Sequence, residues 1–401
     1  MNILFLHRNF PAQFRHIAAE LAKDPHNKVV FITNNDNLNL PNITKVIYKL
    51  KREVPENCHR YLKFYEESIN HAQASAEAAL TLKNQGFIPD VIYGHTWGQT
   101  VFMKDVFPDV PLLCYFEWYY NAEGGDVGFD GRLPDVDAKA RLRCKNAHLN
   151  MDLLACDAGM CPTKWQQSQF PEIFRDKIKV LHDGVDTDFC APYENAKFLV
   201  KEKNLELSAQ DEVITYATRG MEAYRGFPEF MRAAKILLDK RPNLQVVIAG
   251  EDRVCYGAQL HNTTYKEMML KELNLDLNRV HFVGGLPLGQ YVKLLQISSA
   301  HVYLTYPFVL SWSLLDSMAI GCPIVASNTT PVLEVMKDNY NGLLFDFYNI
   351  NQQVEKIEYA LDNKDKMQEL RQNARKTIVD NYNLKNLLPQ HIEFVKSLIK
   401  S

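Results

Sequence analysis

The sequence predicts an α/β protein with two doubly wound domains, each built on a parallel β-sheet. Three observations predict this fold class. Short apolar segments alternate with amphipathic helical patterns along the chain, and a polar segment divides the alternation into two similar halves. The chain also has 401 residues, enough for two or three domains. Strands that are buried on both faces of a parallel sheet appear as continuous apolar runs of this kind.

The first half contains a series of these apolar segments. Residues 2–7 (NILFLH) open it, and the stretch PAQFRHIAAELAKD that follows has apolar residues at helical spacing. Helical patterns separate most of the later segments as well. The other strands that we expect are residues 28–33, 90–95, 111–117, 158–163 and 178–184. We therefore expect a first domain that spans residues 1–186.

A polar stretch at residues 187–211 separates the halves, and a second series follows it. Helical patterns such as PEFMRAAKILLDKR and GQYVKLLQIS lie between its apolar segments. The strands that we expect are residues 212–218, 244–250, 280–285, 300–306, 323–328 and 342–347. The second domain should span residues 187–381. An amphipathic helix at about 382–401 should pack back on the first domain.

Composition excludes several classes of protein. Hydrophobic residues make up 46% of the chain, enough for more than one core, and the net charge of −3 does not indicate nucleic-acid binding. No segment has the about 18 consecutive apolar residues of a membrane span. The N-terminus lacks the features of a signal peptide. The eight cysteines form no CxxC pair, so we expect reduced residues and a cytoplasmic location.

Ligands of doubly wound proteins bind at the carboxyl ends of the strands, so residues that directly follow strands are the first candidates. Arg219 and Arg225 follow the strand at 212–218, and Gly220 and Gly226 lie beside them. Two guanidinium groups with glycines that allow close approach suit a diphosphate. The alternative is a pair of solvated arginines near the start of a helix.

A second candidate site follows the strand at 300–306, where we expect a helix to begin near Ser311. The backbone N–H groups of Ser311, Trp312 and Ser313 would then form an anion site. Asp316 lies one turn further on. Its carboxylate either accepts hydrogen bonds from ribose hydroxyls or simply favours the helix dipole, and spacing does not decide between the two.

Glu334 is a third candidate, because it follows the strand at 323–328. It either faces the same crevice or is an ordinary charge near a helix N-terminus. A nicotinamide dehydrogenase is disfavoured, because no GxGxxG fingerprint follows the first strand.

These stretches together resemble glycosyltransferase family 4, which are retaining enzymes of the GT-B fold. The resemblance lies in Arg-x5-Arg-Gly after a strand, PFVLSWSLLDSMAIGCPIV, Glu-Val-Met and NGLLFDF, in that order. PDVIYGH and the junction KVLHDGVDTDF agree with it in the first half. RNFPAQFRHIA and HTWGQT resemble one bacterial branch. The resemblance implies two Rossmann-like domains that face each other across a cleft.

The resemblance also implies roles on the donor side. Arg219 and Arg225 match the basic pair that binds the donor diphosphate. The family's Glu-x7-Glu motif falls on Phe308 and Asp316: Asp316 matches the acid that holds the ribose, and Phe308 replaces the acid that usually contacts the transferred sugar. The other donor-side residues that the resemblance or the strand ends indicate are Ser311, Trp312, Ser313, Gly284, Gly285, Leu286 and Glu334.

On the acceptor side we expect residues that follow the strands of the first domain. His95 and Glu117, at the ends of two strands, are the candidates for a direct role in catalysis, and Glu117 stands where many relatives carry a histidine. His7 and His182 are expected to be structural. The remaining acceptor-side candidates are Asn9, Phe10, Gln13, Trp97, Asp126 and Asp130.

The function that the resemblance implies is transfer of a sugar, with retention, from a nucleoside-diphosphate sugar to a hydroxyl acceptor in glycan or glycoconjugate biosynthesis. The acceptor would be a glycan, a lipid-linked glycan, a protein or a small molecule. Two alternatives stay open: a sugar-nucleotide epimerase of similar architecture, and a non-catalytic nucleotide-sugar-binding protein, which the substitution at Phe308 allows.

We expect neither a metal nor another cofactor besides the nucleotide-sugar co-substrate. Two Asp-x-Asp patterns, at residues 135–137 and 186–188, lie in expected loops away from the phosphate-binding half. Basic stretches at 46–53 and 139–145 are either solvated faces or peripheral contacts with anionic lipids at the inner face of the membrane.

Overall fold

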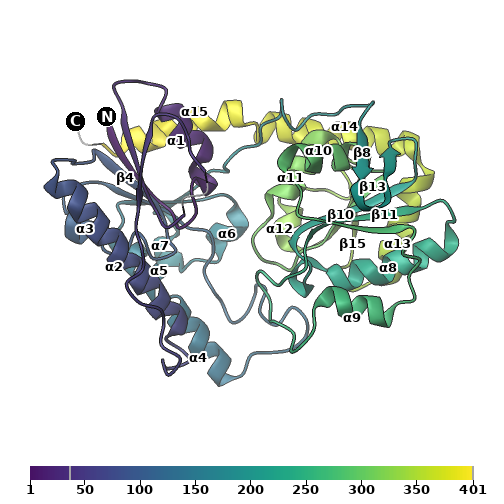
Figure 1. Cartoon of the computed structure of the whole chain (residues 1–401), viewed down its shortest axis with the longest axis horizontal. Helices are drawn as coiled ribbons and strands as arrows, with labels where there is room; N and C mark the ends of the chain where they lie inside the picture. Colours follow the sequence, from purple (N-terminus) through teal and green to yellow (C-terminus); the bar gives the residue numbers. More distant parts are fainter. Residues whose placement is uncertain (36–37, 400–401) are drawn as a thin grey trace. The chain divides into compact units, whose positions relative to one another are not determined.

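The computed structural model describes residues 1–35 and 38–399 of the chain (Figure 1). It divides into two compact units. The first comprises Met1–Gly184 and the segment that begins at Lys385, and the second comprises Val185–Leu384. The boundary therefore follows residue 184, where the sequence indicated residue 186.

The first unit is built on a seven-stranded sheet in the order β3-β2-β1-β4-β5-β6-β7. Every neighbouring pair is parallel. The strands are β1 (Asn2–Leu6), β2 (Lys28–Thr33), β3 (Ile43–Ile47), β4 (Val91–His95), β5 (Leu112–Tyr115), β6 (Ala158–Cys161) and β7 (Ile178–Val180). The edge strand β3 is the one that the sequence did not indicate. It is only half-buried and carries Thr44 and Lys45, so it shows no continuous apolar run.

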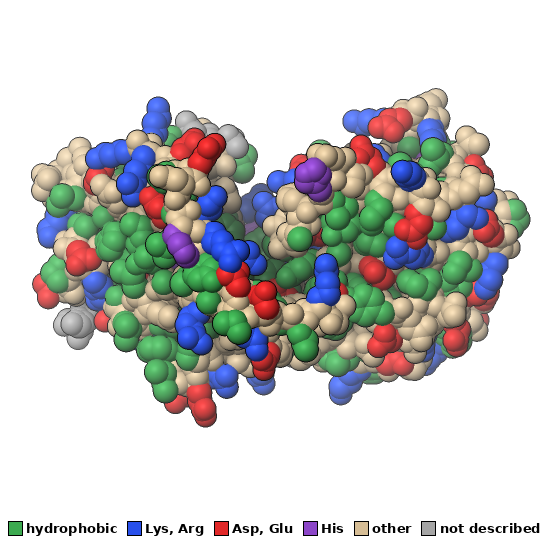
Figure 2. Space-filling model, turned by 90° about the horizontal axis from the view of Figure 1, so that it is seen from below, with side chains coloured by type: hydrophobic (Ala, Val, Ile, Leu, Met, Phe, Trp, Pro, Cys, Tyr) green, Lys and Arg blue, Asp and Glu red, His purple; other side chains and the backbone are tan. Residues whose placement is uncertain are grey.

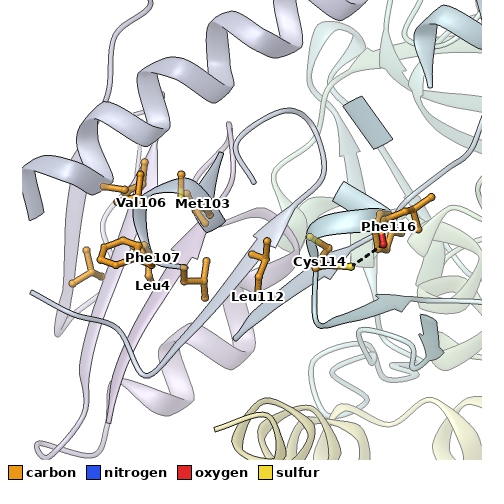
Figure 3. Close-up of a cluster of buried hydrophobic side chains, with 14 of the residues drawn as sticks. Leu4, Met103, Val106, Phe107, Leu112, Cys114 and Phe116 are labelled. Atoms are coloured by element: carbon orange, nitrogen blue, oxygen red, sulfur yellow. Dashed lines mark hydrogen bonds between the residues drawn. The ribbon is translucent and has the colours of Figure 1, made fainter. Parts of the chain in front are cut away.

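Side chains of alternating strand residues fill the two faces of this sheet. Ile3 and Phe5 belong to one buried cluster, and Leu4 and Leu6 belong to the other. Figure 3 shows the second cluster, where Leu4 and Leu112 of the sheet lie near Met103, Val106 and Phe107. The helices are α1 (Arg15–Leu21), α2 (Lys63–Asn84), α3 (Met103–Val106), α4 (Val136–Lys145), α5 (Ala147–Ala155), α6 (Lys164–Ser168), α7 (Glu172–Arg175) and α15 (Leu384–Ser397), with a 3-10 turn η1 (Ala12–Phe14).

Helix α15 covers the other face of the first sheet. Its residues Leu387 and Val395 are buried in the same cluster as Ile3 and Phe5. The C-terminal segment therefore packs with the N-terminal unit.

The second unit has a six-stranded sheet in the order β12-β11-β10-β13-β14-β15, again parallel throughout. Its strand order reverses between β10 and β13, which is the kind of switch point where doubly wound proteins bind ligands. The strands are β10 (Val213–Gly220), β11 (Gln245–Glu251), β12 (Val280–Gly284), β13 (Ala300–Tyr303), β14 (Ile324–Ser327) and β15 (Leu343–Phe345).

The expectation of a purely polar connector at 187–211 was wrong. Residues in this stretch form an antiparallel hairpin of β8 (Lys197–Val200) and β9 (Leu205–Ser208). Phe198, Val200 and Leu207 alternate with exposed residues and pack into a core cluster of the second unit. The pattern was not distinctive because both strands are only four residues long, and the three consecutive apolar residues of β8 include Leu199, which is exposed.

Helices cover the second sheet. They are α8 (Phe227–Lys240), α9 (Tyr265–Glu272), α10 (Leu288–Gln296), α11 (Trp312–Ile320), α12 (Thr330–Leu333), α13 (Ile350–Asp362) and α14 (Lys364–Asn381), with 3-10 turns η2 (Lys201–Lys203) and η3 (Ala223–Arg225). Helix α11 is apolar on most sides because it is packed between the sheet and α14: Leu314 and Met318 share one buried cluster with Ile324 and Ile378.

The surface and the cysteines agree with the expectations from composition. Acidic and basic side chains are interspersed on the face drawn in Figure 2. All eight cysteines are free thiols, and five of them are buried. Within residues 1–35 and 38–399, none of the helices combines the length and the apolar character that a membrane crossing requires.

Candidate functional site

The second unit contains a pocket of about 370 Å³ at the carboxyl ends of its strands. Strands β10 and β11, the loop after β12, helix α10 and the start of α11 contribute to it. The lining residues are Ala217, Thr218, Arg219, Ala249, Gly250, Glu251, Arg253, Gly285, Leu286, Tyr291, Ser311 and Ser313. Its size lies in the range of small-molecule sites, and it is located beside the switch point of the sheet.

Two glycines allow the backbone to approach closely around this pocket. Gly250 has φ +141°, and a Cβ atom there would lie 2.4 Å from the Thr218 carbonyl oxygen. Gly226 has φ +64°, and a Cβ atom there would lie 2.5 Å from Leu304 Cβ. Larger residues would push apart β10 and β11, or η3 and the segment after β13.

The structure brings the two predicted arginines to the same place. Both line a smaller void of about 30 Å³, together with Tyr256, Ser311 and Ser313. Arg219 is exposed at the end of β10, and it also lines the larger pocket. Arg225 is 6% exposed, and its Nη1 donates to Thr305 Oγ1 at 2.7 Å and to the Val309 carbonyl at 3.2 Å. The second guanidinium is thus held in a fixed position at the pocket.

Glu222 organises the loop above Arg225, and the sequence analysis missed it. Its side chain is fully buried, and its carboxylate accepts backbone N–H groups from Cys255 at 3.0 Å, Tyr256 at 3.0 Å and Gly257 at 2.7 Å. This places the Tyr256 ring over Arg225, with 5.0 Å from Cζ to the ring centroid. The only sequence signal was an acid between two arginines after a strand.

The start of α11 lies at the pocket, but its backbone donors differ from the expectation. The Ser311 N–H donates to Tyr303 Oη at 3.0 Å, and the Ser313 N–H donates to Ser311 Oγ at 3.3 Å. The expectation that all three N–H groups are unpaired was therefore wrong, because Ser311 caps its own helix. The hydroxyls of Ser311 and Ser313, 2.9 Å apart, line the pocket instead. Trp312 is 46% exposed.

Asp316 lies inside α11, one turn behind these serines. The described residues that line the pocket do not include Asp316. Cys190 Sγ donates to Asp316 Oδ1 at 3.9 Å. Burial raises the pKa of Asp316 to about 7. Burial raises the pKa of Tyr291, which lines the pocket, and the nearby charge of Asp316 raises it further. Contact between Asp316 and a ribose thus stays a prediction.

Phe308, at the position of the first acid of the family motif, belongs to an aromatic group. It is 8% exposed, and its ring centroid lies 5.3 Å from that of Tyr256 and 5.8 Å from that of Tyr224. Of the other donor-side candidates, Gly285 and Leu286 line the pocket, Gly284 adopts φ +68° at the end of β12, and Glu334 is half-buried at the end of α12.

In the first unit, the ends of β1, β4 and β5 place a group of rings and a carboxylate together. His95 is fully buried; its ring centroid lies 4.4 Å from that of Trp97 and 4.7 Å from that of His7. His95 Nε2 lies 3.7 Å from Glu117 Oε2. Among the described residues, neither ring nitrogen of His95 has a hydrogen-bond partner.

Both histidines of this group are neutral at pH 7. Burial lowers the pKa of His7 to about 3, and burial together with His7 and Arg8 holds the pKa of His95 well below its usual range. The Asn9 N–H donates to His7 Nδ1 at 2.8 Å, and Gln13 also lies beside His7. His7 was expected to be only structural, yet it forms one side of the His95 cluster.

The other acceptor-side candidates occupy different environments. Phe10 is a correction: it is 5% exposed and packs edge-on against Phe31 in the core, because an aromatic ring gains more from burial than from solvent. Asp126 is buried close to Lys145. Asp130 accepts from Arg132 Nε at 2.7 Å on the surface.

The two Asp-x-Asp patterns have local structural roles. Asp135 caps α4 by accepting the Ala138 N–H at 2.7 Å, and Asp137 contacts Arg60 and Tyr61. Asp186 accepts the N–H groups of Asp188 and Phe189. In the described residues, no group of three or more His, Cys, Asp or Glu side chains has the arrangement of a metal site.

Comparison with sequence families identifies both halves of the chain. Residues 25–190 match the glycosyl transferase family 4 group, and residues 200–377 match the glycosyl transferases group 1.

Two curated proteins are similar in sequence. One is the D-inositol 3-phosphate glycosyltransferase of Corynebacterium aurimucosum, 24% identical over 278 residues, which are 68% of this chain and 63% of that protein. The chain thus spans less than two thirds of this relative's length. The other is an uncharacterized glycosyltransferase of Methanocaldococcus jannaschii, 21% identical over 313 residues, which are 77% of this chain and 75% of that protein.

Solved structures share the fold over the whole chain. Sucrose-phosphate synthase from Thermosynechococcus elongatus superposes with a TM-score of 0.74 at 14% identity, and covers 99% of both chains. HepE from Anabaena, in complex with UDP-glucose, gives 0.72 at 15% identity over 99% of this chain and 100% of that one. Because the two family matches together span most of the sequence, the chain belongs to the glycosyltransferases of the family 4 type, with the GT-B fold.

Proposed function

We propose that the protein transfers a sugar, with retention, from a nucleoside-diphosphate sugar to a hydroxyl group of an acceptor. The observation that carries this proposal is the convergence of Arg219, Arg225 and the two serines of the α11 start at one pocket. Guanidinium groups and hydroxyls are suited to bind the oxygens of a diphosphate. The family match supports transfer as the reaction.

A UDP-sugar is the donor that we propose to test first. The HepE structure with the same fold holds UDP-glucose. In this chain the pocket of about 370 Å³ at the strand ends would bind the nucleoside. The loop residues Gly285 and Leu286 would face the base. Asp316 would bind the ribose after the side chain of Tyr291 moves aside.

Negative charge grows on the diphosphate as the bond to the sugar breaks, and the two arginines would stabilise that charge. Of the two arginines, Arg225 would stabilise this charge more strongly, because it is almost completely buried and its orientation is already fixed by Thr305 and Val309. In this scheme an oxygen of the donor phosphate takes the proton of the acceptor hydroxyl. The reaction then needs no enzymic base.

The first unit would bind the acceptor through the cluster around His95. A neutral imidazole with two ring nitrogens that have no protein partner can donate one hydrogen bond and accept another. Glu117 lies 3.7 Å from it and would accept a further acceptor hydroxyl. Trp97 adds an aromatic face next to these polar atoms, as sugar-binding sites require.

We propose a lipid-linked acceptor at a membrane surface, because of exposed side chains of the first unit. Leu133 is 83% exposed and Val136 is 85% exposed at the start of α4. Arg141 and Arg143 follow on the same helix and are exposed as well. Exposed apolar side chains beside basic ones suit insertion at an anionic lipid surface. We also propose that no metal takes part, since the Asp-x-Asp acids are engaged in local contacts.

The test is a binding and transfer screen with UDP-, GDP- and ADP-linked sugars, with and without a chelator. We expect one nucleotide to bind, and its sugar to move to a hydroxyl acceptor with the anomeric configuration kept. Binding without transfer or hydrolysis across the panel would instead indicate a non-catalytic protein.

Turnover of the donor to an isomer without acceptor would indicate an epimerase. Neither alternative receives support from the family matches. Loss of activity on chelation would contradict the metal-free reaction while leaving the class of enzyme intact.

A further inference from the structure

The second unit has another cavity, larger than the nucleotide pocket and separate from it. Its volume is about 600 Å³, and it lies at the C-terminal ends of α10 and α11. One face of α14 and the segment that precedes β8 complete its walls. In the described part of the chain, no residue lines both this cavity and the pocket at the strand ends.

The floor of the cavity is apolar and its walls are polar. Leu295 and Ile320 are buried at the floor. Four glutamines line the walls, and at the mouth Tyr193 exposes 59% of its surface. The glutamines are Gln210, Gln296, Gln368 and Gln372. Gln296 Nε2 already donates to the Ala191 carbonyl at 2.7 Å, and Gln368 Oε1 accepts from Arg371 at 3.2 Å. The other amide groups of the four glutamines can donate to and accept from hydroxyl groups.

The two arginines of the cavity do not make it an anion site. Arg371 Nε donates to the Gly321 carbonyl at 2.5 Å, and Arg375 donates to the carbonyls of Ala319, Cys190 and Thr187. Ala319 and Gly321 form the C-terminal end of α11, where the helix dipole is negative. Arg371 Nη1 also donates to Gln368 Oε1 at 3.2 Å, so both guanidinium groups are engaged by oxygens of the protein.

Two of the three remaining charged side chains pair with each other. Lys376 Nζ lies 3.2 Å from Asp380 Oδ2 on the same helix, and Glu194 adds a negative charge at the mouth. The lining has three basic and two acidic side chains, but both guanidinium groups already donate to oxygens of the protein and Lys376 pairs with Asp380, so little positive charge is left for a phosphate or a carboxylate. It offers amides, carboxylates and an aromatic face, which together suit a neutral ligand that carries many hydroxyls.

We propose that this cavity binds a neutral oligosaccharide, apart from the site of sugar transfer. The exposed face of Tyr193 would pack against the apolar face of a sugar ring, and the glutamines would bind its hydroxyls. The size of the cavity is within the range of ligand sites and holds one or two sugar rings. This inference does not rest on the identity of the acceptor; its test uses UDP, the nucleotide of the proposed donor, to occupy the pocket at the strand ends.

The experiment is titration calorimetry of the full chain with a panel of neutral hexasaccharides of the malto, cello, manno and chito series. Saturating UDP is present so that the nucleotide pocket is occupied. We expect at least one hexasaccharide to bind. Tyr193→Ala should weaken that binding by roughly tenfold, as expected for loss of one aromatic contact. Ala209→Trp, at an exposed turn of the wall, should block it by filling the cavity.

Tyr340→Ala is the matched control, because Tyr340 is 46% exposed in the same unit and does not line the cavity. Its affinity for the hexasaccharide should equal that of the unaltered chain. Equal binding by the Tyr193 and Ala209 variants, or no binding of any hexasaccharide, would overturn the proposal. Preferential binding of inorganic phosphate or a heparin oligosaccharide, lost in the same variants, would overturn the neutral class.

Arg219→Ala separates this proposal from the proposed function. That substitution should lower UDP affinity and leave hexasaccharide affinity unchanged. Loss of hexasaccharide binding in Arg219→Ala would place the sugar in the nucleotide pocket and refute the second site.

Discussion

Replacing Arg219 by alanine should weaken the binding of the nucleoside diphosphate without destabilising the protein. Arg219 is exposed at the end of β10 and lines both voids of the nucleotide site. Its guanidinium would make a charged hydrogen bond to the diphosphate, worth about 1.5–3 kcal/mol. The dissociation constant for the nucleoside diphosphate should therefore rise by about 10- to 150-fold. The free energy of unfolding should change by less than about 0.5 kcal/mol, as for other surface substitutions.

Arg225→Ala is the informative comparison, because Arg225 has a structural role as well. It is buried and donates to Thr305 Oγ1 and the Val309 carbonyl, so its removal leaves two acceptors without a donor. Each such loss costs about 1–3 kcal/mol. We therefore expect Arg225→Ala to lower both nucleotide affinity and stability, whereas Arg219→Ala lowers affinity alone.

Titration calorimetry with the nucleotide that binds best, together with urea denaturation, measures both quantities. Arg232→Ala is the control: Arg232 pairs with Glu272 at 2.7 Å on the surface and is not among the residues that line either void. It should leave nucleotide affinity unchanged. Unaltered affinity in Arg219→Ala, or a loss of affinity that appears only together with unfolding, would refute the assignment of Arg219 to the diphosphate.

Three further predictions concern other parts of the chain. Glu222→Gln should lower the free energy of unfolding by about 1–3 kcal/mol, because the amide N–H₂ group would face a backbone N–H group whose hydrogen bond the carboxylate accepts. An unchanged urea midpoint would contradict this. Burial raises the pKa of Asp316 from 3.8 to about 7, so the folded chain holds this proton more tightly than the unfolded chain, and stability should fall as pH rises from about 4 to about 7. Asp316→Asn should reduce this fall in the free energy of unfolding by about 2–4 kcal/mol. If urea denaturation of the variant has the same pH dependence as that of the unaltered chain, Asp316 does not cause the fall. Replacing Leu133 and Val136 by serine should reduce flotation of the protein with anionic vesicles, whereas Ile173→Ser, at a similarly exposed residue on α7, should not; equal flotation of all variants would exclude α4 as the contact.

The strands that the sequence predicted well are those buried on both faces. Residues 3–6, 29–32 and 246–249 are continuous apolar runs, because a parallel sheet covered by helices leaves no face to water. The edge strand β3 and the hairpin β8–β9 were missed for the opposite reason. Strand β3 has no fully buried residue and carries Thr44 and Lys45, and the hairpin strands are only four residues long with one exposed face.

The convergence of Arg219, Arg225 and Ser311 at one edge of the second sheet could be predicted from the sequence because it depends on chain direction. Parallel strands end at the same edge, so Arg219, Arg225 and Ser311 had to meet once their strands were placed. Glu222 could not be assigned in this way. Its partners, the N–H groups of Cys255, Tyr256 and Gly257, come from a loop more than thirty residues away.

The sequence by itself determined the fold class, the order of the two units and the polar residues that follow strand ends, because hydrophobic periodicity and chain connectivity are local properties. Only the tertiary structure decided which polar groups are already engaged. It showed that Ser311 caps its own helix, that Phe10 belongs to the core, and that His7 lies against His95. Hydrogen bonding and burial depend on neighbours that are distant in the chain, and no pattern within one segment records them.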